Sequence, residues 1–156
     1  MLKYKDLTPD LILNYFPELK RMVENQIAFW EPEEVPAHCL YGNTFNLYLS
    51  ALLHYNQETD MIRRIFVFYE FLATEGDEEV QNLVQTTLLE YLWDYSHIYQ
   101  RALSFMGEYT RKLNEKISLF LNKPKNDKRE KDIEKFQNYL NQVKSLLSDV
   151  HIQYPM

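Results

Sequence analysis

The stretch DEEVQNLVQTTLLEYLWD, residues 77–94, decides how the rest of the sequence is read. Its residues recur three and four positions apart, the spacing of one face of an α-helix. The positions on this face are Val80, Leu83, Val84, Thr87, Leu88, Tyr91 and Leu92. Leu89 and Trp93 add a second apolar stripe. A helix that is apolar on two sides is enclosed by other helices, so we expect residues 77–94 to form a helix near the centre of the fold.

The segment before it, residues 60–75, has the same period. Its apolar stripe is Ile62, Ile65, Phe66, Tyr69, Leu72 and Ala73. The run 65–69 also has high strand propensity, but the helical period continues on both sides and favours a helix. Between the two helices, Gly76 ends the first and Asp77 is suited to cap the second.

Further helices are indicated on both sides of this pair. Thr8-Pro9 is a helix start, with Thr as the capping residue and Pro in the first turn. Pro17 ends this short helix and begins another that reaches Trp30. The remaining expected helices cover residues 45–55, 95–105 after a kink at 94–96, 106–121 and 133–150. The sequence therefore predicts an all-α single domain over residues 1–156, an irregular bundle of about seven helices with exposed loops near 31–43 and 122–131.

The composition limits the class of protein. Hydrophobic residues make up 46% and charged residues 26%, as in ordinary globular domains. Only 3 glycines occur in 156 residues, which argues against glycine-rich phosphate loops and turn-rich β architecture. No apolar run has bilayer length and the first residues do not resemble a signal peptide. The single cysteine, Cys39, fits a reducing compartment, so we expect a cytoplasmic protein without a membrane partner.

Charge is unevenly distributed along the chain. The formal net charge is −6. Residues 1–80 carry 6 basic and 14 acidic residues, and residues 81–156 carry 11 basic and 9 acidic residues. Nucleic-acid binding requires a basic face, so the acidic half argues against it. It favours instead a basic protein partner, because complementary charge speeds and selects encounters.

Two acidic clusters are the candidate partner-binding sites. The first follows an aromatic residue in the loop, and a tyrosine closes that loop; the second is the turn before the central helix. The candidate residues are Trp30, Glu31, Glu33, Glu34, Tyr41, Asp77, Glu78 and Glu79. An aromatic anchor ringed by carboxylates suits a basic protein surface. The alternative is that acidic residues at helix starts serve capping and solubility.

Catalytic and metal-binding patterns are weak. Glu90, Asp94 and His97 share one expected helix face and have ligand chemistry, but no second helix offers an evident partner, and ion pairing is the alternative interpretation. His38 and Cys39 are a possible base and nucleophile without a third, orienting group. No established catalytic motif is present. We therefore expect no cofactor, no metal and no enzymatic activity.

Two other patterns have ordinary interpretations. His54, at the border of an apolar helix face, is expected to be a packed histidine rather than a ligand. The basic cluster within residues 123–131 is interrupted by acidic residues and lacks aromatics, so a solvated loop is expected there.

The stretch Met61–Asp94 resembles one helical hairpin of the HEAT type. Within it, residues 73–80 (ATEGDEEV) and 88–94 (LLEYLWD) resemble small uncharacterised all-helical bacterial proteins, some of which resemble immunity proteins of toxin systems. That resemblance implies a cytoplasmic protein that binds and blocks a toxin domain, and it assigns no functional residue. A structural or adaptor role is the alternative, and a helical metal-binding enzyme is a third.

Overall fold

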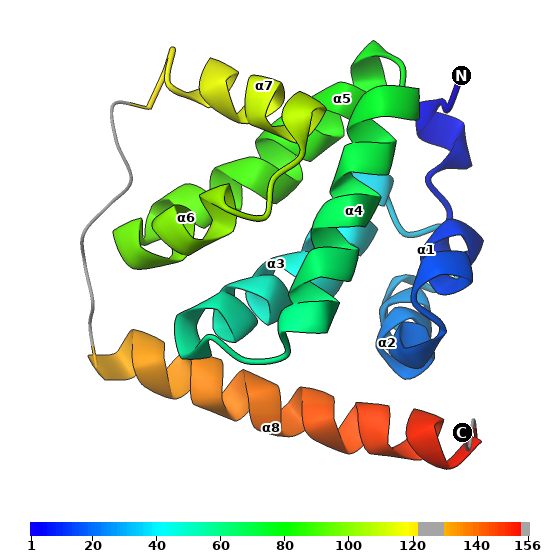
Figure 1. Cartoon of the computed structure of the whole chain (residues 1–156). Helices are drawn as coiled ribbons and strands as arrows, with labels where there is room; N and C mark the ends of the chain where they lie inside the picture. Colours follow the sequence, from blue (N-terminus) through cyan, green and yellow to red (C-terminus); the bar gives the residue numbers. More distant parts are fainter. Residues whose placement is uncertain (122–129, 154–156) are drawn as a thin grey trace.

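Helices form wherever the three- and four-residue period was found. The computed structural model describes residues 1–121 and 130–153, with side chains described for 1–121 and 133–147 (Figure 1). The α-helices of this part are α1 Pro9–Tyr15, α2 Lys20–Trp30, α3 Ala37–Tyr55, α4 Thr59–Glu75, α5 Glu78–Leu83, α6 Ser96–Leu103, α7 Glu108–Ile117 and α8 Glu130–Gln153. The described residues contain no strand, and the prediction of a single all-α domain is confirmed.

Short helical segments connect several of these helices. They are the 3-10 helices η1 Tyr4–Asp6, η2 Pro17–Leu19 and η4 Glu90–Asp94, and the π-helix η3 Val84–Leu89. The expected start at Thr8 is confirmed, since its hydroxyl accepts a hydrogen bond from the Leu11 N–H at 3.4 Å. No described helix has the length and apolar character needed to cross a membrane.

The loop expected over 31–43 is shorter than predicted. Its extended part ends at Pro36, the residue that precedes α3. Gly42, read from sequence as a loop residue, lies inside α3, where a Cβ would meet the Thr87 Cγ2 methyl at 3.0 Å. The glycine therefore serves a close approach between α3 and η3 rather than a turn. The second expected loop, 122–131, lies almost entirely outside the described residues.

The centre of the bundle is α3, not the 77–94 segment that the sequence indicated. It packs against α2, α4, α6, α8 and η3, and Figure 1 shows it running through the middle of the molecule. Phe45 of α3 contacts the rings of Phe16, Phe68 and Tyr69, which come from α1's end and from α4. Buried residues occur on most sides of α3 along its 19 residues, and a helix enclosed in this way lies at the centre of a bundle.

Residues 77–94 form a helical column, but not one uniform helix. It begins as α5, widens into η3 and tightens into η4. The side-chain amide of Asn46, on α3, donates to the Thr87 backbone oxygen at 2.9 Å, which accounts for part of the irregularity because it engages a main-chain acceptor within the column. Tyr95 is extended (φ −136°, ψ 125°) and separates η4 from α6. The break therefore lies where the sequence predicted a kink, at 94–96.

The last helix, α8, lies across the ends of several others. Figure 1 shows it running along one side of the bundle, next to α3 and α2. Phe136, Leu140 and Val143 are its buried residues among those whose side chains are described. They recur four and three positions apart, as the sequence predicted for this helix.

Candidate functional site

The N-terminal residues bring the two acidic clusters together. The Leu2 N–H donates to the Glu75 carbonyl at 2.7 Å, and the Asp77 N–H donates to the Leu2 carbonyl at 2.8 Å. A few residues later, the Tyr41 hydroxyl donates to the Thr8 carbonyl at 3.2 Å. The segment 2–8 is therefore attached to the acidic turn at one end and to α3 at the other.

The acidic loop forms one wall of a surface hollow. The hollow has a volume of about 650 Å³. Glu31, Glu33 and Glu34 line it from the loop, and Tyr4 and Lys5 line it from η1. The three glutamates are exposed. Ile27, Leu7 and Val35 add apolar surface to the same hollow.

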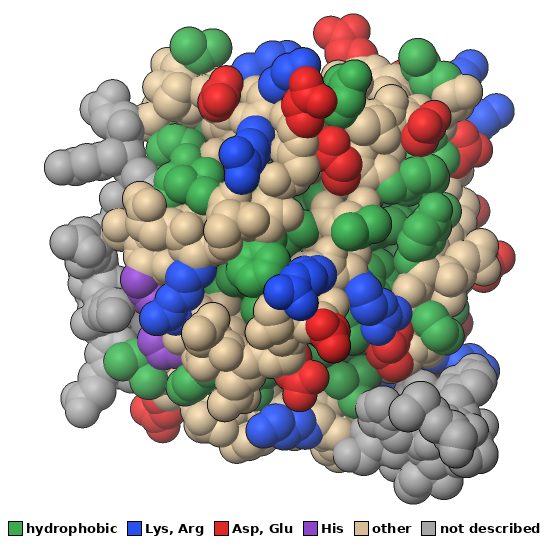
Figure 2. Space-filling view, in the orientation of Figure 1, with side chains coloured by type: hydrophobic (Ala, Val, Ile, Leu, Met, Phe, Trp, Pro, Cys, Tyr) green, Lys and Arg blue, Asp and Glu red, His purple; other side chains and the backbone are tan. Residues whose placement is uncertain are grey.

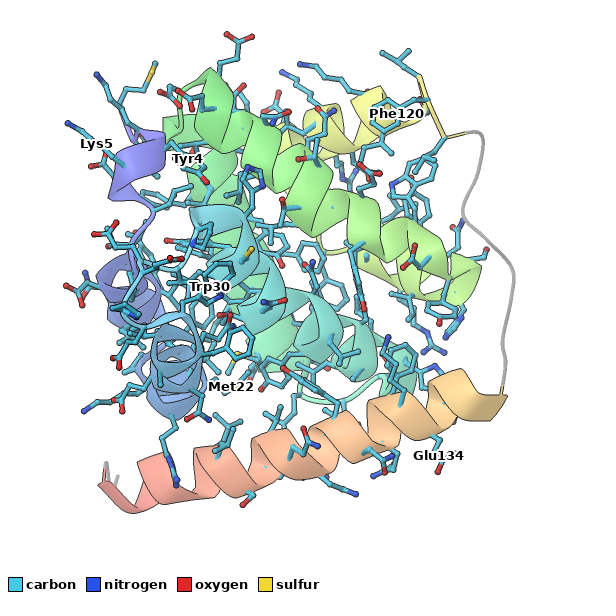
Figure 3. The ribbon with its side chains drawn as sticks, turned by 180° about the vertical axis from the view of Figure 1, so that it is seen from behind. Tyr4, Lys5, Met22, Trp30, Phe120 and Glu134 are labelled. Carbon is cyan, nitrogen blue, oxygen red and sulfur yellow. The ribbon has the colours of Figure 1, made fainter. Side chains whose placement is uncertain are left out.

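The acidic turn lines a second hollow beside the first. Its volume is about 410 Å³, and it is lined by Tyr4, His38, Glu78, Glu79 and Asn82. Tyr4 lines both hollows, so the two are adjacent. Figure 3 shows Tyr4 lying towards the body of the protein and Lys5 pointing away from it. We call the surface made by Tyr4, Glu31, Glu33, Glu34, His38, Glu78 and Glu79 the acidic face.

The aromatic part of the acidic face is a tyrosine–histidine pair. The ring centroids of Tyr4 and His38 are 5.7 Å apart. The Nδ1 atom of His38 shares a short hydrogen bond with the Thr87 hydroxyl, which holds the imidazole against η3. The pair therefore presents an aromatic surface between two groups of carboxylates.

Negative charge dominates this face. Glu31, Glu33, Glu34, Glu78 and Glu79 form no ion pair with any described residue. Lys5 also lines the first hollow and is exposed. On the face shown in Figure 2, Lys and Arg side chains stand beside Asp and Glu side chains.

Three of the residues predicted for partner binding are not part of the acidic face. Two of them lie elsewhere in the molecule, and the third makes a capping hydrogen bond. Tyr41 is 0% exposed inside α3, so it does not close the loop, because the chain is already helical from Ala37. Trp30 is half-buried and lines a separate groove between α2 and α8 with Phe29 and Tyr139. Asp77 caps α5, its Oδ1 accepting from the Val80 N–H at 3.1 Å.

Sequence reasoning missed two members of the face. Tyr4 lies in a three-residue helix, too short to show a period, and its position depends on the long-range pairing of Leu2 with residues 75–77. His38 was considered as a possible base beside Cys39, or as a solvated or capping residue, and not as part of the acidic clusters. Its observed partner, Thr87, is 49 residues away in the sequence. No local signal predicts either placement.

The predicted triplet Glu90, Asp94 and His97 does not share one helix face. The extended residue Tyr95 interrupts the helix, and His97 Nε2 lies 2.7 Å from His54 Nδ1. His54 is indeed packed, with its ring centroid 5.1 Å from that of Phe136. Within residues 1–121 and the described side chains of α8, no group of three or more His, Cys, Asp or Glu residues is placed to hold a metal ion.

The fold defines a single-domain all-α protein with an acidic face at its N-terminal side. The chain belongs to the family described as "Domain of unknown function (DUF7674)", whose model matches residues 9–122. No curated protein and no solved structure matches the chain. The match includes both acidic clusters and His38, whereas η1 with Tyr4 and α8 lie outside it.

Proposed function

We propose that this protein is a non-enzymatic binding module that sequesters a basic protein partner through the acidic face, in the manner of an immunity or antitoxin protein. The observation that carries the proposal is the meeting of two acidic clusters around Tyr4. These clusters are more than 40 residues apart in sequence, from Glu34 to Glu78.

The arrangement suits protein recognition in two ways. Five carboxylates without ion pairs among the described residues attract a basic surface over a long range and raise the association rate. Tyr4 and His38 lie between them and provide a rigid apolar contact, the kind of anchor that supplies most of the affinity in interfaces. Binding would occlude the partner's functional surface sterically and electrostatically, and the protein would act in the cytoplasm.

The test is capture of a partner from a lysate of the source cells at low salt, followed by a rising salt step. We expect one basic protein to be retained in stoichiometric amount and released by salt, because exposed charge pairs are screened. The double variant Glu33→Lys/Glu34→Lys should lose that protein. Activity of the purified partner should fall when the wild-type protein is added.

A matched control separates the acidic face from net charge. Glu115 of α7 and Glu134 of α8 are exposed and lie away from the face. The variant Glu115→Lys/Glu134→Lys changes the net charge by the same amount and should retain the partner. Equal retention by both double variants would exclude the acidic face as the binding site.

A second candidate function, an adaptor, rests on the groove between α2 and α8. Phe29 is 82% exposed there, and Trp30, Tyr139 and Leu146 line the groove beside it. A large exposed aromatic ring is a typical contact residue. Retention that is insensitive to salt and lost in Phe29→Ser would favour this function over sequestration of a basic partner.

A further inference from the structure

A cleft beside the C-terminal half of α3 is bordered by four elements. Its volume is about 440 Å³, and η2, α3, α4 and α8 all contribute to it. One wall is apolar and consists of Leu52, Met61, Leu140, Val143 and Leu147. The charged groups around it are Glu18, Glu58, Asp60, Arg64 and Lys144. An alkyl chain fits the apolar wall, and the charged groups decide which head group the cleft prefers.

One of the residues that line this cleft is a buried tyrosine. Tyr48 of α3 is only 3% exposed and lines the cleft. Its hydroxyl makes no hydrogen bond with any described residue. Burial raises the pKa of this hydroxyl above its usual value, and the carboxylates of Glu58 and Glu18 raise it further. The phenol therefore stays protonated, close to two negative charges, with an oxygen available to accept a hydrogen bond.

The two nearest carboxylates are not equivalent. Glu18 receives two hydrogen bonds from the Arg64 guanidinium, at 2.7 and 2.9 Å, so these two charges offset each other. The side chain of Glu58 forms no ion pair or hydrogen bond with a described residue. Asp60, at the rim, pairs with Arg63 at 3.3 Å and its side chain is 98% exposed. Glu58 is thus the carboxylate open to a ligand.

Glu58 also has a backbone conformation that is unfavourable for a residue with a side chain. Its φ of 54° and ψ of 52° lie in the left-handed region, where glycine is preferred. Glu58 precedes α4 without a side-chain capping hydrogen bond. The local structure therefore gives no reason for a glutamate at this position, whereas the cleft does.

We propose that the cleft binds a small primary alkylammonium ligand. Its ammonium group lies between the Glu58 carboxylate and the Tyr48 hydroxyl oxygen, and its alkyl chain lies on the wall formed by Leu52, Met61 and Leu140. Three donors on the ammonium match these two acceptors. Arg64 remains paired with Glu18. No bond is made or broken in this association.

The experiment is calorimetric titration of the full chain with three probes of equal chain length: hexylammonium, hexanol and hexanoate. We expect hexylammonium to bind, hexanol to bind more weakly and hexanoate not to bind. Glu58→Gln should weaken hexylammonium binding about tenfold, and Tyr48→Phe about fivefold, from the loss of a charge-assisted and a neutral hydrogen bond. Glu115→Gln, the same kind of change at an exposed glutamate outside the cleft, should bind as the wild type does.

Two further variants keep the test decisive. Glu58→Gly relieves the left-handed conformation, so it should raise the thermal midpoint while it weakens hexylammonium binding. The acidic-face variant Glu33→Lys/Glu34→Lys should leave hexylammonium binding unchanged, which separates this proposal from the proposed function. Equal binding of hexylammonium and hexanoate, or full binding by Glu58→Gln, would overturn the assignment of the cleft, as would no binding of hexylammonium to the wild type.

Discussion

The turn before α5 and the turn before α7 both supply a hydrogen-bond acceptor at the start of a helix, but the two acceptors come from different parts of the chain. Each must supply an acceptor for the free N–H groups at the start of a helix. Before α5 the acceptor is Asp77, which caps Val80 three residues along. Before α7 it is Glu70 of α4, which accepts from the N–H groups of Tyr109 and Thr110 at 3.1 and 2.9 Å.

The glycines of the two turns differ in the same way. A Cβ on Gly76 would lie 2.4 Å from the Leu72 carbonyl oxygen and 2.4 Å from Val80 Cγ1, both close in sequence. A Cβ on Gly107 would lie 2.5 Å from the Glu70 carboxylate. The helix cap and the glycine of the first turn thus depend on neighbouring residues, and those of the second depend on tertiary structure. A local sequence pattern predicts the first kind of turn but does not predict the second.

The largest expected effect is that of Gly76→Ala. The new methyl group meets a backbone oxygen and a buried side chain that cannot both move away. We expect a loss of about 3 kcal/mol in the free energy of unfolding, from steric overlap in a packed region. Urea unfolding followed by circular dichroism measures it. A loss below about 1 kcal/mol would mean that the α4–α5 turn relaxes freely.

Glu70→Ala tests the turn that depends on tertiary structure. The carboxylate accepts three hydrogen bonds, the third from the Thr110 hydroxyl at 2.8 Å. Its removal should lower the free energy of unfolding by about 2 kcal/mol, against about 1 kcal/mol for Asp77→Ala, which loses a single cap. The same unfolding measurement compares the two variants. A smaller effect for Glu70→Ala would show that α7 is held by its apolar contacts alone.

The smallest effect is a pH dependence carried by Glu70. Burial opposes ionisation of its carboxyl group, but the hydrogen bonds from Thr110 and Tyr109 and the charge of Lys112 outweigh it, so its pKa lies below the usual value. A lowered pKa stabilises the folded state above the pKa of the unfolded chain. This contribution is lost as the pH falls through the lower, folded-state pKa.

Glu70→Gln removes the titrating group and keeps the shape. The stability difference between wild type and this variant should therefore be full near neutral pH and decline below the usual carboxyl pKa. Thermal unfolding from pH 7 downward, in steps of about half a unit, follows it. A difference that stays constant across this range would show that ionisation of Glu70 does not contribute to the stability of the folded state.

The sequence predicted those parts of the fold that depend on neighbours. The Thr8 cap, the Gly76–Asp77 turn and the break near Tyr95 were all found. Gly42 was misread because a glycine beside an asparagine indicates a turn, whereas here it allows Thr87 to approach α3. The same misreading placed Tyr41 on the surface, although it is 0% exposed.

The candidate site was predictable in composition but not in geometry. Charge counting identified both acidic clusters, and their exposed glutamates lie in the loop after α2 and in the first turn of α5. Their proximity depends on Leu2 pairing with residues 75–77, which no periodicity reveals. The Tyr48 cleft was not predicted at all, because it requires α8 to lie beside Leu52 and Glu58.

The attachment of Leu2 to Glu75 and Asp77 has a practical consequence for experiments on this protein. An affinity tag or fluorescent fusion joined ahead of Met1 would emerge beside Gly76 and next to Glu78 and Glu79. Glu78 and Glu79 line the hollow that Tyr4 and His38 share. Reporters for the capture experiment therefore belong at the other end of the chain, and a loss of binding in an N-terminally tagged protein should first be checked after tag removal.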